Sequence, residues 1–221
     1  MNLPNREIVT DATLVLFCKR PRLNQGKQRL ANEIGAKAAL SIANSLLECA
    51  IEDAKNWQGP VVLACSNHED MAWANSLNID AQIIEQLPQG QSGNLGQRLN
   101  YVDQTLRQLG HTQLVFIGTD APMLTHEHYQ EILLVLGSND IALSHAQDGG
   151  VVIMANKVPW PFISHLPWST NKLSFALLEA CRESLLSTTY GLPGYDIDYL
   201  EDIKKLLTDL PKDCRPARQA L

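Results

Sequence analysis

No apolar run in this sequence of 221 residues approaches the roughly 20 residues that a membrane-spanning helix needs. A secretory leader is not indicated either, because acidic residues precede the first apolar stretch and no small-residue cleavage pattern follows it. Cysteine is scarce: the five cysteines are widely scattered and never spaced CxxC, which argues against a disulfide framework or a zinc knuckle. We therefore expect a cytoplasmic protein with reduced, mostly buried thiols and no membrane partner.

An excess of positive charge is also missing. Lysine and arginine number 18 against 24 aspartates and glutamates, which gives a net charge of −6. Because nucleic acids and anionic membranes attract proteins first through phosphate neutralisation, this balance disfavours both as partners. With 45% apolar and 19% charged residues, the chain is expected to form one compact domain over residues 1–221, with 211–221 as a loose tail.

Several catalytic signatures are absent as well. No GxSxG motif occurs and no cysteine has a recognisable histidine partner, so acyl transfer lacks support. The Gly26-Lys27 pair is not a Walker loop, because Gln28 replaces Ser/Thr and the first glycine of that motif is missing. His126 and His128 are spaced i, i+2 and would not share one helical face, which argues against a zinc site.

The sequence does contain a regular alternation of short apolar runs and helical periods, which predicts a three-layer, Rossmann-like α/β fold with a mostly parallel sheet and helices on both faces. The first run, 13–18, should be a central strand buried on both faces. Proline- and glycine-containing stretches at 156–168 and 188–194 are expected to be loops. Further strands are predicted at 61–65, 81–84, 114–117, 141–143 and 151–154, and helices around 39–54, 95–109, 129–136, 170–186 and 200–210.

A basic segment follows the first predicted strand. From Lys19 to Arg29 the chain reads KRPRLNQGKQR, with five basic residues and no acidic one. In an open α/β sheet, ligands bind beyond the carboxyl ends of the strands, where such a loop can offer backbone and side-chain donors to phosphate. The alternative is a solvated basic loop, but its position after a central strand favours a polyphosphate site.

Carboxylates follow later strands. Asp120 stands just past the run LVFI, with Gly118 and Pro122 beside it, and a carboxylate there could hold Mg²⁺ against phosphate oxygens or simply cap a turn. Asp196 and Asp198 alternate, so in an extended segment both would point to one side and could share a cation, although Asp198 could instead cap the next helix. We expect these carboxylates and the basic loop to converge at one edge of the sheet.

Two further elements have functional and structural interpretations. The Asp148-Gly149-Gly150 turn could bring backbone close to a ligand or be an ordinary hairpin turn. Trp168, followed by Ser169 and Thr170, could form a loop wall against a base or sugar, or a hydrophobic staple before a helix.

Taken in chain order, six segments resemble a bacterial family of glycosyltransferase-A-like proteins in the nucleotide-diphospho-sugar transferase superfamily, often labelled selenodomain-associated transferases. The segments are FCKRPRLNQGKQRL, SGNLGQRL, IGTDAPMLT, QDGGVVI, LPWST and DIDYLEDI. They extend from about Leu14 to Ile203, nearly the whole chain. The wider superfamily includes molybdenum-cofactor guanylyltransferase and sugar-1-phosphate nucleotidylyltransferases.

The resemblance implies a glycosyltransferase-A-type fold and specific site residues. Asp120 and Lys27 would be catalytic, with Asp120, Asp196 and Asp198 at a metal site for Mg²⁺ or Mn²⁺. The sequence departs from the family pattern at Asn24, where glycine is usual, and at Gln28, where threonine is usual. The residues implied to bind the nucleotide are Lys19, Lys27, Arg29, Asn94, Gly96, Arg98, Asp148, Gly149 and Gly150.

The interpretation favoured by these observations is an Mg²⁺-dependent transferase that moves a nucleotidyl or glycosyl group from a nucleoside triphosphate or nucleotide-sugar to a small acceptor. The alternative is a nucleotide-binding or regulatory module that kept the fold without turnover. A structural interaction protein would leave the ordered set of loop carboxylates and bases unexplained.

Overall fold

The computed structural model describes residues 10–209 and 213–221 and contains one seven-stranded sheet. The strand order is β3-β2-β1-β4-β6-β5-β7. Of these strands, β6 alone runs antiparallel to its neighbours, β4 and β5. The predicted mostly parallel α/β sheet is therefore confirmed. The strands are β1 (Thr13–Cys18), β2 (Val61–Cys65), β3 (Gln82–Glu85), β4 (Leu114–Ile117), β5 (Ile141–His145), β6 (Val151–Asn156) and β7 (Thr188–Tyr190).

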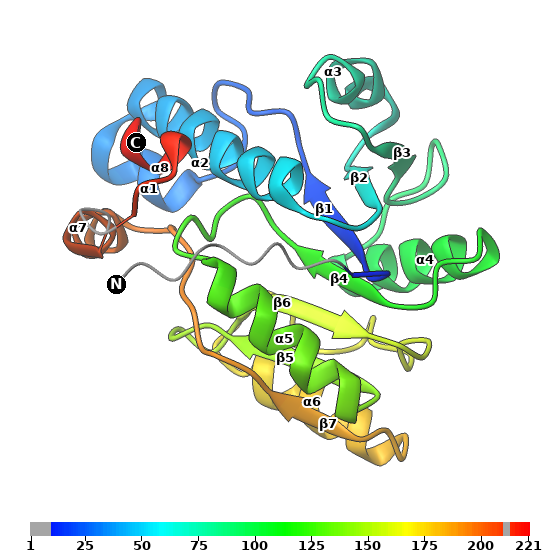
Figure 1. The fold of residues 1–221 in the computed structure, drawn as a ribbon. Helices are drawn as coiled ribbons and strands as arrows, with labels where there is room; N and C mark the ends of the chain where they lie inside the picture. The colour runs from blue at the N-terminus through cyan, green and yellow to red at the C-terminus, as the bar shows by residue number, and fades with distance from the viewer. Residues whose placement is uncertain (1–9, 210–212) are drawn as a thin grey trace.

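Helices cover both faces of the sheet, as the alternating pattern predicted (Figure 1). One core contains apolar side chains of α2, α3 and α5, and the other contains those of α4 and α6. A smaller cluster joins α2 to α7. The helices are α1 (Gln28–Ile34), α2 (Ala36–Asn56), α3 (Met71–Asn75), α4 (Leu95–Gln108), α5 (His126–Ser138), α6 (Leu173–Glu183), α7 (Leu200–Asp209) and α8 (Pro216–Gln219), with a short 3₁₀ turn at His68–Asp70.

Strand β1 shows why a continuous apolar run marks an interior strand. Leu14 and Leu16 face the core with α2, whereas Val15 faces the core with α4. All three side chains are fully buried. Because both faces are covered by helices, no polar position is tolerated in the middle of the run.

Two expectations about the last third of the chain differ from the structure. The stretch expected to be a loop after position 188 begins with strand β7, which pairs in parallel with β5. The end of the chain, expected to be a loose tail, contains helix α8 with a fully buried arginine, Arg218. Helix α8 contacts α2, and residues 210–212 lie outside the described residues.

All five cysteines are free, and four of them are buried as expected, while Cys214 is exposed. No helix in the described ranges is both long and apolar enough to cross a membrane.

Candidate functional site

A cavity of about 800 Å³ lies at the carboxyl edge of the parallel strands. Its wall includes residues that directly follow β1, β2 and β4, together with the β5–β6 turn and the segment before α7. Because these segments leave the sheet at the same edge, residues far apart in the sequence meet there. The structure brings the basic loop and the carboxylates together around one cavity, as the sequence predicted.

The loop from β1 to α1 contains a tight turn at residues 22–25. Asn24, Gly26 and Lys27 have φ angles of 61°, 73° and 45°, all in the left-handed region. Asparagine tolerates this region better than most residues with a side chain, which explains how Asn24 can stand where the family usually has glycine. The base of the loop is anchored by Asp70, which accepts hydrogen bonds from the backbone of Arg20 and the guanidinium of Arg22.

The ammonium of Lys27 lies between two carboxylates. Its Nζ is 3.1 Å from Asp120 Oδ2 and 3.0 Å from Asp198 Oδ1, and only 14% of the side chain is exposed. Burial disfavours the charged lysine, but the neighbouring carboxylates outweigh it and raise the pKa of Lys27 above its ordinary value. Arg29 donates to the other oxygen of Asp198 at 2.9 Å.

Asp120, Asp196 and Asp198 form an acidic cluster. Each contributes one oxygen to a set whose members lie within 4.8 Å of one another. The backbone fixes this arrangement, because the amide of Ile197 donates to the carbonyl of Asp120 at 2.9 Å. The two segments that carry the carboxylates are therefore joined directly, and the three side chains could hold one cation.

Within the cluster, the carboxyl group of Asp196 has a raised pKa. Its pKa rises from 3.8 to about 7, first because of burial and then because of the charges of Asp120, Asp148 and Asp198, which Lys27 only partly offsets. A divalent cation would relieve this repulsion.

The charges on the cavity wall balance. The basic side chains are Lys19, Lys27, Arg29 and Arg98, and the acidic ones are Asp120, Asp148, Asp196 and Asp198. Basic residues alone therefore do not make this cavity a strongly positive site for polyphosphate.

The Asp148-Gly149-Gly150 turn joins β5 to β6 and contributes unequally to the cavity. Asp148 and Gly150 line it, and Asp148 Oδ1 accepts the amide of Gly150 at 2.9 Å. Gly149 instead packs against the start of α6: its φ is +90°, and a Cβ there would lie 2.0 Å from the carbonyl oxygen of Asn171. The structure thus gives Gly149 a packing role rather than a place on the cavity wall.

Asn94 and Gly96 also stand outside the cavity wall. Asn94 caps α4, since its Oδ1 accepts the amide of Gln97 at 3.0 Å while Gln97 Oε1 accepts the amide of Asn94 at 2.9 Å. Gly96 allows the loop before α6 to approach α4, because a Cβ there would lie 2.4 Å from Trp168 Nε1. The spacing N-x-x-Q of a capping box was present in the sequence and could have indicated the first role.

Arg98 lines the cavity but is held by the protein itself. It donates to the carbonyls of Gly93 and Ser66 and to Oε1 of Gln86, at 3.0–3.2 Å. Ser66 and Gln86 line the cavity too and were not predicted from the sequence. Lys19 also lines the cavity and is exposed, as are Gln28 and Arg29.

Trp168 lies on the cavity wall, which agrees with its interpretation as part of a loop wall. It lines the cavity together with Ser169 and Thr170, and its Nε1 donates to the carbonyl of Ile163 at 2.9 Å. The loop before α6 thereby forms part of the cavity wall.

A family model described as "uncharacterized protein conserved in bacteria" (DUF2064) matches residues 50–170, more than half of the chain. The chain belongs to this family. The matched region contains Asn94 to Arg98, Asp120 and the Asp148 turn, but neither Lys27 nor Asp198. No curated protein matches the chain.

Solved structures of low sequence identity share the fold. A candidate nucleotide-diphospho-sugar transferase from Desulfovibrio desulfuricans G20 superimposes with a TM-score of 0.83 at 18% identity, covering 95% of this chain and 93% of that one. CMP:2-keto-3-deoxy-manno-octonic acid synthetase, solved with CTP, has a TM-score of 0.54 at 12% identity, with 92% and 100% covered. Rv0371c from Mycobacterium tuberculosis H37Rv, solved with manganese, has a TM-score of 0.50 at 15% identity, with 90% and 99% covered. These matches confirm the resemblance to the nucleotide-diphospho-sugar transferase fold.

Proposed function

We propose that the protein is a metal-dependent cytoplasmic transferase that binds a nucleoside triphosphate or a nucleotide-sugar and moves its nucleotidyl or glycosyl group to a small acceptor. The observation that carries this proposal is Lys27, held by Asp120 and Asp198 on the wall of the 800 Å³ cavity. A cationic donor and carboxylates at one point are the groups that phosphate transfer requires.

The donor set of the acidic cluster fits a hard divalent cation. Carboxylate oxygens are the ligands that Mg²⁺ and Mn²⁺ prefer, and Asp120, Asp196 and Asp198 supply three from two joined segments. The equal numbers of acidic and basic side chains around the cavity support a metal requirement, because a polyphosphate would otherwise face as much repulsion as attraction. The manganese bound by the Rv0371c protein of the same fold agrees with this choice.

Each charged side chain then has a separate task. A cation held by Asp120, Asp196 and Asp198 would offset the negative charge that develops on the phosphate groups. Lys27 would donate to an oxygen of the leaving phosphate, and Lys19 would approach the phosphates from the exposed rim. Arg29 would keep Asp198 in place through its ion pair. In nucleotidyl transfer an acceptor oxygen attacks the α-phosphorus and pyrophosphate leaves; in glycosyl transfer a nucleoside diphosphate leaves.

The proposal is tested first by thermal stability with a panel of nucleoside triphosphates and nucleotide-sugars, with and without Mg²⁺ or Mn²⁺. A ligand that binds only the folded protein raises its melting temperature. The best ligand is then incubated with sugar phosphates and simple alcohols, and the leaving group is identified by phosphorus NMR. Pyrophosphate would identify nucleotidyl transfer, and a nucleoside diphosphate would identify glycosyl transfer.

The site variant is Asp120→Asn, which keeps the volume and deletes the charge. Its matched control is Asp80→Asn, at an exposed aspartate outside the cavity wall. We expect metal-dependent stabilisation by nucleotide in the parent and the control but not in Asp120→Asn. Equal stabilisation of all three proteins, or no stabilisation of the parent by any ligand of the panel, would reject the proposal.

A further inference from the structure

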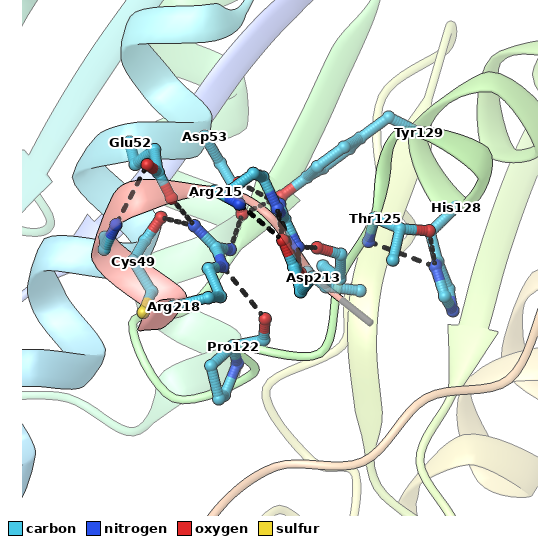
Figure 2. A network of polar contacts seen from close by, with 12 residues as sticks. Cys49, Glu52, Asp53, Pro122, Thr125, His128, Tyr129, Asp213, Arg215 and Arg218 are labelled. Atoms are coloured by element: carbon cyan, nitrogen blue, oxygen red, sulfur yellow. Dashed lines mark hydrogen bonds and ion pairs between the residues drawn. The ribbon is translucent and has the colours of Figure 1, made fainter. Parts of the chain in front are cut away.

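The end of the chain contributes a buried arginine to the protein interior. The side chain of Arg218 in α8 has no exposed surface, which is unusual for a residue that remains charged. Its terminal nitrogens donate to Glu52 Oε2 at 2.8 Å and to Asp53 Oδ2 at 2.7 Å, both on α2 (Figure 2). Burying an ion pair costs desolvation energy that a packed apolar side chain would not, so stability alone is a poor account of this arginine.

Arg218 also has two backbone partners, the carbonyl oxygen of Cys49 on α2, at 2.5 Å, and that of Pro122. Its Nε donates to the carbonyl oxygen of Pro122 at 3.1 Å, across the gap between α2 and the loop that follows β4 (Figure 2). Proline has no amide hydrogen, so its carbonyl is the polar backbone group through which this point of the loop can be held. Arg218 therefore joins the loop to α2.

Arg215 holds the same loop two residues further on. It donates to the carbonyl of Leu124 at 2.6 Å and to Asp53 Oδ1 at 2.7 Å. Both arginines thus form ion pairs with the carboxylate of Asp53, and the hydroxyl of Tyr129 donates a hydrogen bond to it at 2.9 Å. Burial raises the pKa of Asp53, while both arginines oppose that rise. Through the two arginines, the carbonyls of Pro122 and Leu124 are both linked to the buried carboxylate of Asp53.

This loop begins at the acidic cluster. Asp120 lies two residues before Pro122, and its own carbonyl accepts the amide of Ile197, between Asp196 and Asp198. The backbone around Asp120 is therefore fixed on one side by the segment 196–198 and on the other by the two arginines. A shift of the loop would move Asp120 relative to the other carboxylates of the cluster.

We propose that Arg218 is a positioning residue for Asp120. The segment 213–221 holds the carbonyls of Pro122 and Leu124 and thereby sets the geometry of the metal site. This inference rests on the proposed function, because the measurable effect of these contacts is on the affinity of the site for a cation. Arg218 is not one of the residues that line the cavity. Its effect passes through the loop.

The test uses Arg218→Lys in the full chain. Lysine keeps the charge opposite Asp53, but its single ammonium cannot maintain the guanidinium's separate bonds to Pro122 and α2. The matched control is Arg182→Lys on α6, a 57% exposed arginine paired with Glu179. Arg215→Lys serves as a second variant if Arg218→Lys does not fold, since Arg215 is less buried.

Two measurements are made well below the melting temperature of each protein. Hydrogen exchange reports the loop itself, in particular the amide of Leu124, which donates to the carbonyl of Ala121. Titration with Mn²⁺ alone reports the site. We expect faster exchange at 120–124 and roughly tenfold weaker Mn²⁺ binding in the variant, with neither change in Arg182→Lys.

The outcomes separate the two proposals. Unchanged exchange would show that Arg218 does not order the loop. Faster exchange with unchanged Mn²⁺ affinity would give Arg218 a purely structural role and overturn the positioning. If the parent protein itself binds no Mn²⁺, the metal-dependent function fails, and the positioning role fails with it, whatever the exchange shows.

Discussion

Lys27 Nζ lies 3.1 Å from Asp120 Oδ2 although the two residues are 93 positions apart in the chain. The contact exists because β1 and β4 are adjacent parallel strands, so the segments that follow them leave the same edge of the sheet. A second contact, from the same ammonium to Asp198, brings in the segment before α7. One lysine thus connects three separate parts of the candidate site.

Replacing Lys27 with alanine should weaken binding of a nucleoside triphosphate by roughly 10- to 100-fold, the range expected for a lost charged hydrogen bond. Binding of the corresponding nucleoside should change little, because it has no phosphate to contact. Calorimetric titration with both ligands at two salt concentrations measures the difference, and rising salt should weaken the parent's triphosphate binding more than the variant's.

The control for this variant is Lys37→Ala, at an exposed lysine in the first turn of α2. Equal losses for nucleoside and triphosphate would indicate a disturbed loop rather than a phosphate contact. No loss for either ligand would show that Lys27 pairs with Asp120 and Asp198 without contacting phosphate.

Asn94→Ala should lower the free energy of unfolding by about 1 kcal/mol, the usual cost of losing a helix cap. Gln97→Ala removes the other half of the same capping box and should have a similar effect in urea unfolding. Nucleotide affinity should be unchanged in both. A selective loss of affinity in Asn94→Ala would instead make Asn94 a ligand-binding residue, as the family resemblance implied.

Much of the fold could be predicted because buried strands leave a local signal. The runs at β1, β2 and β4 are continuously apolar, since helices cover both of their faces. Strand β7 was missed because it has three residues, Thr-Thr-Tyr, beside a glycine- and proline-containing stretch. Its strand conformation depends on pairing with β5, which no local pattern reveals.

The candidate site was predictable where it depends on chain position after a strand, as for Asp120 and the first loop. It was not predictable where it depends on contacts between distant segments. Asp70 anchors Arg22 from 48 residues away, and Arg218 holds Pro122 from 96 residues away. Neither residue stands in a recognisable motif, so only the folded arrangement indicates its role.

Gly149→Ala should destabilise the protein by about 3 kcal/mol or more, because the substitution combines a left-handed backbone with a steric clash. The added Cβ would lie 2.0 Å from the carbonyl oxygen of Asn171. Gly137→Ala is the matched control: it lies in α5, and its Cβ would meet nothing within 4 Å. That variant should be neutral or more stable by roughly 0.5–1 kcal/mol.

Denaturant unfolding at constant pH measures both glycine variants. If Gly149→Ala unfolded like the parent, the turn would have to move freely against α6. Its glycine would then be better explained by approach to a ligand than by packing.

The last prediction concerns Asp196, whose pKa rises from 3.8 to about 7. Between these values the folded protein holds a proton that the unfolded chain has released, so the metal-free protein should lose stability as the pH rises from about 4 to 7. In a chelating buffer the melting temperature should therefore fall over this range, and Asp196→Asn should reduce that fall by several degrees, because its amide carries no charge. About 1 kcal/mol corresponds to roughly 2–4 °C in a domain of this size.

Asp80→Asn, the exposed control, should retain the parent's decline. At pH 8 Mn²⁺ should restore more stability to the parent than to Asp196→Asn, since the cation replaces the missing positive charge in the cluster. A parent whose metal-free stability increased through this range, with Asp196→Asn behaving identically, would show that the carboxylates do not repel one another as their spacing requires.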